Sequence, residues 1–375
     1  MREIRLSMNE VKLPFNARLA CTLLCIILVI YIARVGHTLI IPLAFATLVA
    51  IMLLPIASQL EKWRFSRGAA AFTVVMLFVA ALVGVLMLLG TQMGAFVADF
   101  PHLQKQLLDQ LNSLQSWINV RFHIDSTQQM DYLEQMAMGT LGSATSFISS
   151  TLLSLSSLLI FIVFVLLYSF FLLLYRSLII TFLIKLFRGK HRDKLLNVVV
   201  QTRYIIKGYV TGLMIETIVV AIVNCTMFWI LGIKYAPLLG IMAALFNLIP
   251  YLGIYIATVI CMILTLTNSS LATTIQVGGG LLIVHFLDSN ILLPRIMGSK
   301  VKINALVTIL GVVLGNLIWG VPGMFLAIPF IAILKIIFEH IEYMEPWAIL
   351  LGDVTMKGKK KPALPKGPEP GPVSE

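Results

Sequence analysis

The chain has little charge for its length. Of its 375 residues, 59% are hydrophobic and only 12% are charged, whereas soluble domains are typically about 25% charged. Several apolar runs exceed the roughly 20 residues needed to cross a hydrocarbon core of about 30 Å. These runs are continuous rather than alternating, which argues against a membrane β-barrel. We therefore expect an all-α polytopic membrane protein.

Cysteines and catalytic motifs are also scarce. The four cysteines all lie inside apolar runs, so they predict neither a disulfide framework nor a zinc site. The sequence has no metal-ligand cluster, no nucleotide-binding loop and no GxSxG or HExxH signature,. We therefore expect no enzymatic activity, no cofactor and no bound metal. Any transport should be passive or driven by an ion gradient.

The net charge of +11 is distributed in a way that excludes nucleic acid as a partner. The basic residues lie in short loops between apolar runs, as the positive-inside rule describes. This rule predicts a multi-pass membrane protein with both termini in the cytoplasm. Of the 28 Lys and Arg residues, 24 then lie inside. The four on the outer face are Arg34, Lys105, Arg121 and Lys234.

The apolar runs predict about six full spanning helices and two broken ones. The full spans cover about residues 19–33, 38–60, 68–97, 147–175, 208–231 and 271–293. Segments 235–267 and 303–338 are interrupted by IPYLG and WGVPG, each leaving arms of about 14–16 residues, or roughly 21–24 Å of helix. Gly and Pro favour a reversal there. We predict two helical hairpins that enter from opposite faces, either re-entrant or crossing in short arms.

The same pattern divides the chain into five parts. We expect three N-terminal helices, an extracytoplasmic amphipathic helical segment, a fourth helix with a basic cytoplasmic segment, a transport core with both hairpins, and a disordered cytoplasmic tail. These parts cover residues 1–98, 99–146, 147–207, 208–353 and 354–375, respectively. The apolar stripe of the second part should cover the bundle or a neighbouring subunit, so we expect a homo-oligomer.

An acidic residue stands near the end of the last full span, in HFLDSNILLPR (285–295). An ionised Asp at the centre of a spanning helix costs roughly 2.5–3.5 kcal/mol. His285, Asp288 and Ser289 share one helix face at spacings i, i+3 and i+4. Such groups are candidates for ion or solute binding. The alternative is that Asp288 lies near the headgroups and pairs with Arg295 or Lys300.

Four further polar residues are candidates for the pathway. Glu216 lies deep in the fifth span without a local partner, which makes it the second acidic candidate. Asn290 follows Asp288 closely, and Asn247 and Asn316 lie in the first arms of the two hairpins. Each of these two could bind a polar substrate or only bond across helices. Opposed, Gly/Pro-interrupted segments are typical of a transporter site, although two ordinary kinked helix pairs would read similarly.

The C-terminal half resembles the autoinducer-2 exporter (AI-2E) family of bacterial membrane transporters. The resemblance is carried by LGIKYAPLLGIMAALFNLIPYLG (231–253), LDSNILLPRIMGSKVKINALVTIL (287–310) and WGVPGMFLAIPFIAILK (319–335). The matching motif positions are Pro250, Gly253, Asp288, Asn290, Pro294, Gly298, Gly320, Pro322, Gly323 and Pro329. Many members have Gln where His285 stands, and a His-Pro pair in place of Asn304 and Ala305.

This resemblance implies a transport function. Family members are named for export of the quorum-sensing signal autoinducer-2, and some are assigned as sodium/proton antiporters. We therefore expect a secondary transporter that exports a small polar solute similar to autoinducer-2, with Asp288 and Glu216 binding a coupling sodium ion or proton. The alternatives are a monovalent cation/proton antiporter that uses the same carboxylates and a non-transporting membrane scaffold that assembles through its outer helices.

Overall fold

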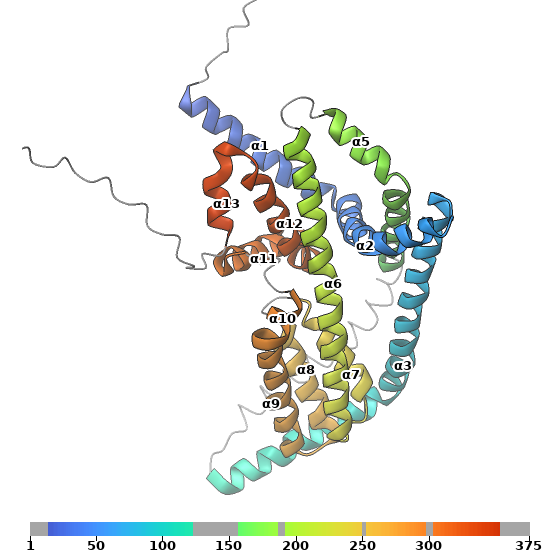
Figure 1. The fold of residues 1–375 in the computed structure, drawn as a ribbon. Helices are drawn as coiled ribbons and strands as arrows, with labels where there is room; N and C mark the ends of the chain where they lie inside the picture. The colour runs from blue at the N-terminus through green and yellow to red at the C-terminus, as the bar shows by residue number, and fades with distance from the viewer. Residues whose placement is uncertain (1–13, 123–156, 187–191, 250–252, 298–302, 353–375) are drawn as a thin grey trace, which may run out of the picture.

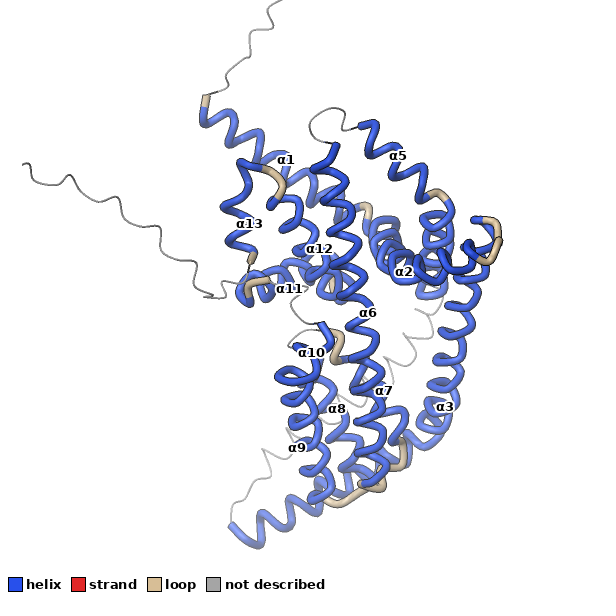
Figure 2. The backbone as a smooth tube through the Cα atoms, viewed as in Figure 1, coloured by secondary structure: helices blue, strands red, loops and turns tan. Residues whose placement is uncertain are grey.

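The computed structural model describes residues 14–122, 157–186, 192–249, 253–297 and 303–352. Nearly all of this part is helical, and Figure 2 shows no β-strand in it. Helices are favoured in lipid because they satisfy their own backbone hydrogen bonds. Seven of the described helices are long and apolar enough to cross a membrane. The predicted all-α polytopic membrane fold is confirmed.

The N-terminal part consists of long apolar helices that pack on one another. Its elements are α1 (Phe15–Val35), α2 (His37–Lys62), α3 (Arg67–Phe122), the helix Ser157–Leu174 and α5 (Arg176–Leu186). Arg176 donates a hydrogen bond to Glu61 and so joins α5 to the end of α2. α3 is one continuous helix that runs past residue 99, where the outer segment was predicted to begin.

The C-terminal part holds both hairpins and most of the buried polar residues among the described ones. Its elements are α6 (Arg192–Ile230), α7 (Ala236–Phe246), α8 (Gly253–Asn268), α9 (Leu271–Leu287), a π-helical turn (Asp288–Leu292), α10 (Leu293–Met297), α11 (Ala305–Trp319), α12 (Val321–Glu339), a 3₁₀ turn (Glu342–Met344) and α13 (Glu345–Leu351). α7 and α8 form the first predicted hairpin, and α11 and α12 form the second.

The predicted arm lengths of about 14–16 residues were wrong for two of the four arms. α8 and α11 have 16 and 15 residues, but α7 has 11 and α12 has 19. α12 is long because it restarts directly after the turn at Gly320, with Pro322 in its first turn, where proline costs no hydrogen bond,. At 1.5 Å per residue α12 measures about 28 Å, and it is the seventh helix of spanning length.

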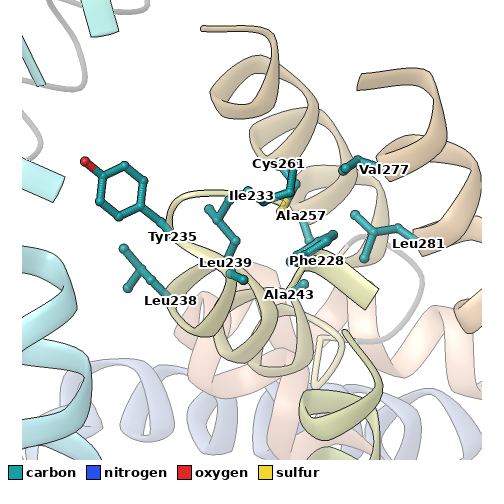
Figure 3. Packing of buried hydrophobic residues seen from close by; sticks show 11 residues of the cluster. Phe228, Ile233, Tyr235, Leu238, Leu239, Ala243, Ala257, Cys261, Val277 and Leu281 are labelled. Atoms are coloured by element: carbon teal, nitrogen blue, oxygen red, sulfur yellow. The ribbon is translucent and has the colours of Figure 1, made fainter. Parts of the chain in front are cut away.

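α6 is the axis against which both hairpins pack. Its Ile230 half lies beside α7, α8 and α9, and its Arg192 half contacts α2 and α12 (Figure 1). At the Ile230 end, Phe228 is fully buried among side chains of α7, α8 and α9 (Figure 3). The hairpins meet where Ile249, near the tip of the first, packs against the apolar residues Val312, Met324 and Ala327 of the second.

Two polar contacts tie the outer helices to this core. Trp319, at the tip of the second hairpin, donates an indole hydrogen bond to the Ala33 carbonyl of α1 at 2.8 Å. Asp99 of α3 accepts hydrogen bonds from Lys234 and Tyr235 in the loop before α7. The bond to Asp99 raises the pKa of the Lys234 ammonium. α3 is thereby attached to the Ile230 end of the α6–α9 bundle.

The turn of the second hairpin depends on glycine at three positions. Gly320 has φ +64, a backbone conformation that side chains with a Cβ rarely adopt,. α11 and α12 approach closely where Gly315 faces Gly323. A Cβ built on Gly315 would lie 2.3 Å from the Gly323 carbonyl oxygen, and one on Gly323 would lie 2.0 Å from the Gly315 carbonyl oxygen. Small residues permit such close helix contact in membranes.

Replacing Gly323 by alanine should therefore destabilise the second hairpin. Overpacking of this kind costs about 1–3 kcal/mol, so we expect a clearly lower melting temperature of the purified protein in detergent. Gly279→Ala is the matched control, because nothing lies within 4 Å of a Cβ at that position of α9. A Gly323→Ala protein that melts with the parent would contradict the close backbone contact.

Candidate functional site

Glu216 lies on the buried face of α6, near the place where the two hairpins meet. Its side chain is only 5% exposed. Tyr209, Val220 and Asn224 are buried on the same face, at spacings of seven, four and eight residues from Glu216. These spacings are two turns, one turn and two turns of helix, so the four side chains form one stripe.

Asp288 stands at the point where α9 changes from an α-helix to a π-helical turn. The Leu293 N–H bonds to the Asp288 carbonyl oxygen, five residues back, instead of the four of an α-helix. Single π-turns inside helices are frequent at functional sites, because the extra residue changes the direction of the neighbouring side chains. Asp288 is likewise 5% exposed, so the turn places a carboxyl group inside the protein.

Asn247 connects the two acidic residues. It is the C-cap of α7 and thus belongs to the tip region of the first hairpin. Its amide nitrogen donates a hydrogen bond to Asp288 Oδ2 at 2.9 Å and a longer one to Glu216 Oε1 at 3.4 Å. Because both bonds come from the same amide nitrogen, the two carboxyl groups lie next to each other. One hairpin tip therefore holds together side chains from α6 and α9.

The site contains buried polar atoms that have no hydrogen-bond partner. Glu216 Oε2, Asp288 Oδ1 and His285 Nδ1 are buried without a partner among the described residues. None of the ion pairs found in that part of the chain involves Glu216 or Asp288. Two ionised carboxylates side by side in a buried site repel each other and lose their hydration. The pair is therefore suited to hold a shared proton, a cation or both.

A cavity of about 420 Å³ adjoins the carboxyl pair. Its walls come from α6, the tip of the first hairpin, α8, α9 with the following turn, α10 and the second hairpin. They consist of Tyr209, Leu213, Glu216, Asn247, Leu248, Ile249, Ile254, His285, Asp288, Ser289, Leu293, Ile303, Thr308 and Ile328. The cavity extends from Glu216 toward the Arg192 end of α6, since its other α6 residues are Tyr209 and Leu213.

The structure brings together four of the six predicted pathway residues. Glu216, Asn247, His285 and Asp288 line the same cavity, and Ser289 lines it as well. Asn290 does not join them, because it is exposed and its amide donates to the Phe286 carbonyl oxygen at 2.8 Å. Asn316 is exposed on α11 and is not part of the cavity wall.

The alternative in which Asp288 pairs with Arg295 is not what the structure shows. Among the described residues, no ion pair joins Asp288 to Arg295, and Arg295 is exposed. Lys300 lies outside the described residues. The physical reason is that the π-helical turn places the Asp288 carboxyl group next to Asn247, on the inside of the bundle.

The predicted turn residues take several different roles. Gly253 begins α8 so close to α7 that a Cβ would lie 1.7 Å from the Phe246 carbonyl oxygen. Gly320 forms the second turn, and Pro322 and Gly323 open α12. Pro329 is buried inside α12, and Pro294 lies in α10. Pro250 and Gly298 lie outside the described residues.

Sequence reasoning missed Tyr209 and Asn224. Both lie on the same helical face as Glu216, so extending the helical period from that residue in both directions would have found them. The π-helical turn left no comparable signal in the sequence, because the motif also fits a regular α-helix.

The structure is a multi-pass helical bundle, and its buried acidic pair faces a cavity between two hairpins. This is the architecture of a membrane transporter. The comparison with protein families agrees and is more specific. The family described as "AI-2E family transporter" matches residues 21–343, and the chain belongs to this family. The family resemblance inferred from the C-terminal motifs is confirmed, and the match extends through the N-terminal half.

Individual relatives cover most of the chain. It is 24% identical over 362 residues to the AI-2 transport protein TqsA of Escherichia coli (strain K12), which covers 93% of this chain and 98% of TqsA. It is 24% identical to YhhT of the same organism over 340 residues, 87% of this chain and 90% of YhhT. YrrI of Bacillus subtilis (strain 168) is 31% identical over 132 residues, 35% of this chain and 37% of YrrI. YhhT and YrrI are named only in general terms as transport proteins.

Neutralising one acidic residue should stabilise the folded protein. Asp288→Asn removes one of two adjacent buried carboxyl groups and keeps the size of the side chain. Two adjacent buried carboxylates repel each other and lose hydration, and an unsatisfied buried polar group costs about 1–3 kcal/mol. We therefore expect a higher melting temperature in sodium-free detergent at neutral pH. Asn290→Ala is the control, because Asn290 is exposed and bonds only within its own helix. A lower melting temperature for Asp288→Asn than for this control would contradict the prediction.

Proposed function

We propose that the protein is a secondary transporter of the bacterial inner membrane that exports a small polar solute, driven by proton or sodium binding at the Glu216–Asp288 pair. One observation carries the proposal: two buried carboxyl groups, held together by the Asn247 amide, border a cavity and have no basic partner among the described residues. Such an acidic pair is costly to bury, and binding of a proton or a sodium ion would offset that cost.

The cavity supports a small solute. Ligand sites of about 300–1,000 Å³ that are mostly apolar with a few polar groups are typical of small-molecule binding. This cavity has about 420 Å³, and its polar groups include Tyr209, Asn247, His285 and Thr308. The name of the relative TqsA, an AI-2 transport protein, makes autoinducer-2 the first solute to test.

The charge of the carboxyl pair supports coupling of solute transport to ion binding. With one proton shared between the two groups, the pair carries a single negative charge. A second proton or one sodium ion then makes the site neutral, and loss of that ion makes it charged again. Moving a charged site through the membrane is far more costly than moving a neutral one. Occupancy by an ion can therefore control which conformations the transporter adopts.

The second candidate is a monovalent cation/proton antiporter at the same residues. It is favoured by the chemistry of the unpaired atoms, which are two carboxyl oxygens and an imidazole nitrogen. All three accept a proton, and the oxygens also suit a hard cation. Membership of a transporter family weighs against the third alternative, a scaffold without transport activity.

The topology belongs to the proposal as well. We place both termini in the cytoplasm, because that arrangement puts 24 of the 28 basic residues on the inner side,. The Arg192 end of α6 then faces the cytoplasm and the Ile230 end faces outward. α1 has no buried residue and exposes apolar side chains all round, which suits contact with lipid or with a second copy of the chain in a homo-oligomer.

Transport by purified protein in proteoliposomes tests the proposal. We would impose a proton or sodium gradient and follow both internal pH and uptake of labelled autoinducer-2. Asp288→Asn and Glu216→Gln should each lower gradient-driven flux at least about tenfold. Each substitution removes a charged ligand of the ion, which contributes about 1.5–3 kcal/mol to binding, and about 1.4 kcal/mol corresponds to a factor of ten in affinity. Asn290→Ala should keep the flux of the parent.

The outcomes separate the candidates. Solute flux that follows the gradient supports the coupled exporter. A cation-driven pH change without solute flux supports the antiporter. Well-folded parent protein that moves neither solute nor ions, or acidic variants that transport like the parent, would overturn the proposal.

A further inference from the structure

A second, smaller space lies on the far side of the carboxyl pair. It shares the walls Asn247, Ile254, His285 and Asp288 with the large cavity. Its other walls are Val220, Asn224, Ala243, Leu281 and Val284. On α6 it is bordered by Val220 and Asn224, whereas the large cavity is bordered by Tyr209 and Leu213. The small space therefore extends from Asp288 toward the Ile230 end of α6, and Glu216 is not one of its walls.

Asn224 is the one α6 polar group in the wall of this space. Its side chain is 1% exposed, and its amide oxygen Oδ1 has no hydrogen-bond partner in the described part of the chain. An unpaired buried amide oxygen costs about 1–3 kcal/mol. Replacement by a hydrophobic residue would remove that cost, so the polar group is unexplained by packing alone.

The groups around this space define the chemistry of a ligand. Asn224 Oδ1 and Asp288 Oδ1 are unpaired oxygen atoms, and His285 Nδ1 is unpaired as well and accepts when the ring proton is on Nε2,. The Asn247 amide already donates to both carboxyl groups. The other five walls are apolar, and no Lys or Arg borders the space. A cation or a hydrogen-bond donor satisfies such a set of acceptors, whereas an anion does not.

The size of the space favours a bare cation over a larger hydrogen-bond donor as the ligand. As the side chains stand, it is too small to hold a water molecule. A bare sodium ion is smaller than water, and amide and carboxylate oxygens are the ligands that hard cations prefer.

The space ends at an apolar barrier. One helical turn beyond Asn224, Phe228 is fully buried and packs in a cluster with Leu281, Ala243 and Ala257 (Figure 3). Leu281 and Ala243 are also walls of the space itself. Asn224 is thus the last polar α6 side chain on this stripe before the hydrophobic core. A cation that leaves the carboxyl pair in this direction meets Asn224 before it meets the barrier.

We propose that Asn224 provides a second ligand position for a dehydrated monovalent cation, which it holds together with Asp288 on the side of the acidic pair facing the Phe228 barrier. This inference rests on the proposed ion coupling and adds a residue and a direction to it. The cation would step from the large cavity past Glu216 and Asp288 to Asn224. Opening of the contacts around Phe228 would then release it.

Sodium binding by the purified full-length protein tests this assignment. The readout is the sodium concentration that gives half-maximal binding, measured with radioactive sodium and with the sodium-dependent rise in melting temperature. Asn224→Leu keeps the approximate volume and removes the oxygen, and we expect it to raise that concentration about tenfold or more. Asn224→Asp restores an oxygen at the same reach and should bind sodium at least as well as the parent.

The controls separate a ligand from a structural residue. Thr265→Val removes another buried, unpaired oxygen that borders neither space, and it should leave the sodium dependence unchanged. If Asn224→Leu does not fold, Asn224→Ala removes the same oxygen without added bulk. A merely structural role of Asn224 would change the melting temperature without sodium but not the sodium concentration for half-maximal binding.

Two results would overturn the inference, and they differ in what they say about the proposed function. If the parent binds sodium and Asn224→Leu binds it equally well, Asn224 is no ligand, while coupling at the carboxyl pair stands. If the parent binds no sodium, a cation position at Asn224 is excluded. Proton-driven flux in the proteoliposome experiment then shows whether the proposed transport function survives.

Discussion

The hydrogen bonds from the Asn247 amide to Asp288 and Glu216 are the contacts on which the centre of this structure depends. They bring together the tip of one hairpin, the middle of α6 and the π-helical turn after α9. Two carboxyl groups in such a place repel each other unless a proton or cation joins them. Binding or loss of a proton or cation at the two carboxyl groups therefore changes the force between α6 and the turn after α9. The Asn247 amide at the hairpin tip bonds to both groups, so the same change acts on the tip.

The packing of the two hairpins connects the carboxyl pair to the rest of the bundle. In the first hairpin α7 packs on the Ile230 half of α6, and in the second hairpin α12 contacts the Arg192 half. The hairpins touch where Ile249 packs against Val312, Met324 and Ala327. Asn247 and Ile249 are two residues apart, so the polar contact and the apolar contact move together. Coupling of this kind needs an element with two arrangements, and the hairpin tip is the natural candidate.

Family membership and geometry answer different parts of the functional question. Membership of the AI-2E family establishes a transporter but leaves the solute open, since the relatives differ in what their names specify. The proposed ion coupling rests on the geometry, because an unpaired buried oxygen of each carboxyl group belongs to the cavity wall. The two agree if solute and ion share one cavity, with the acidic pair at one end and the apolar cluster of Phe228 beyond it.

The sequence by itself determined the membrane fold, the two hairpins and the acidic candidates Glu216 and Asp288. These follow from local chemistry. Long apolar runs partition into lipid, Gly and Pro interrupt helices, and a carboxyl group inside an apolar run is costly and therefore a candidate functional group. Only the tertiary structure decided that Asn247 joins the two acids and that Asn290 and Asn316 lie apart from them. Those relations depend on the rotation of each helix about its axis and on the π-helical turn at Asp288. Packing between helices distant in the sequence sets that rotation, and no local pattern encodes it.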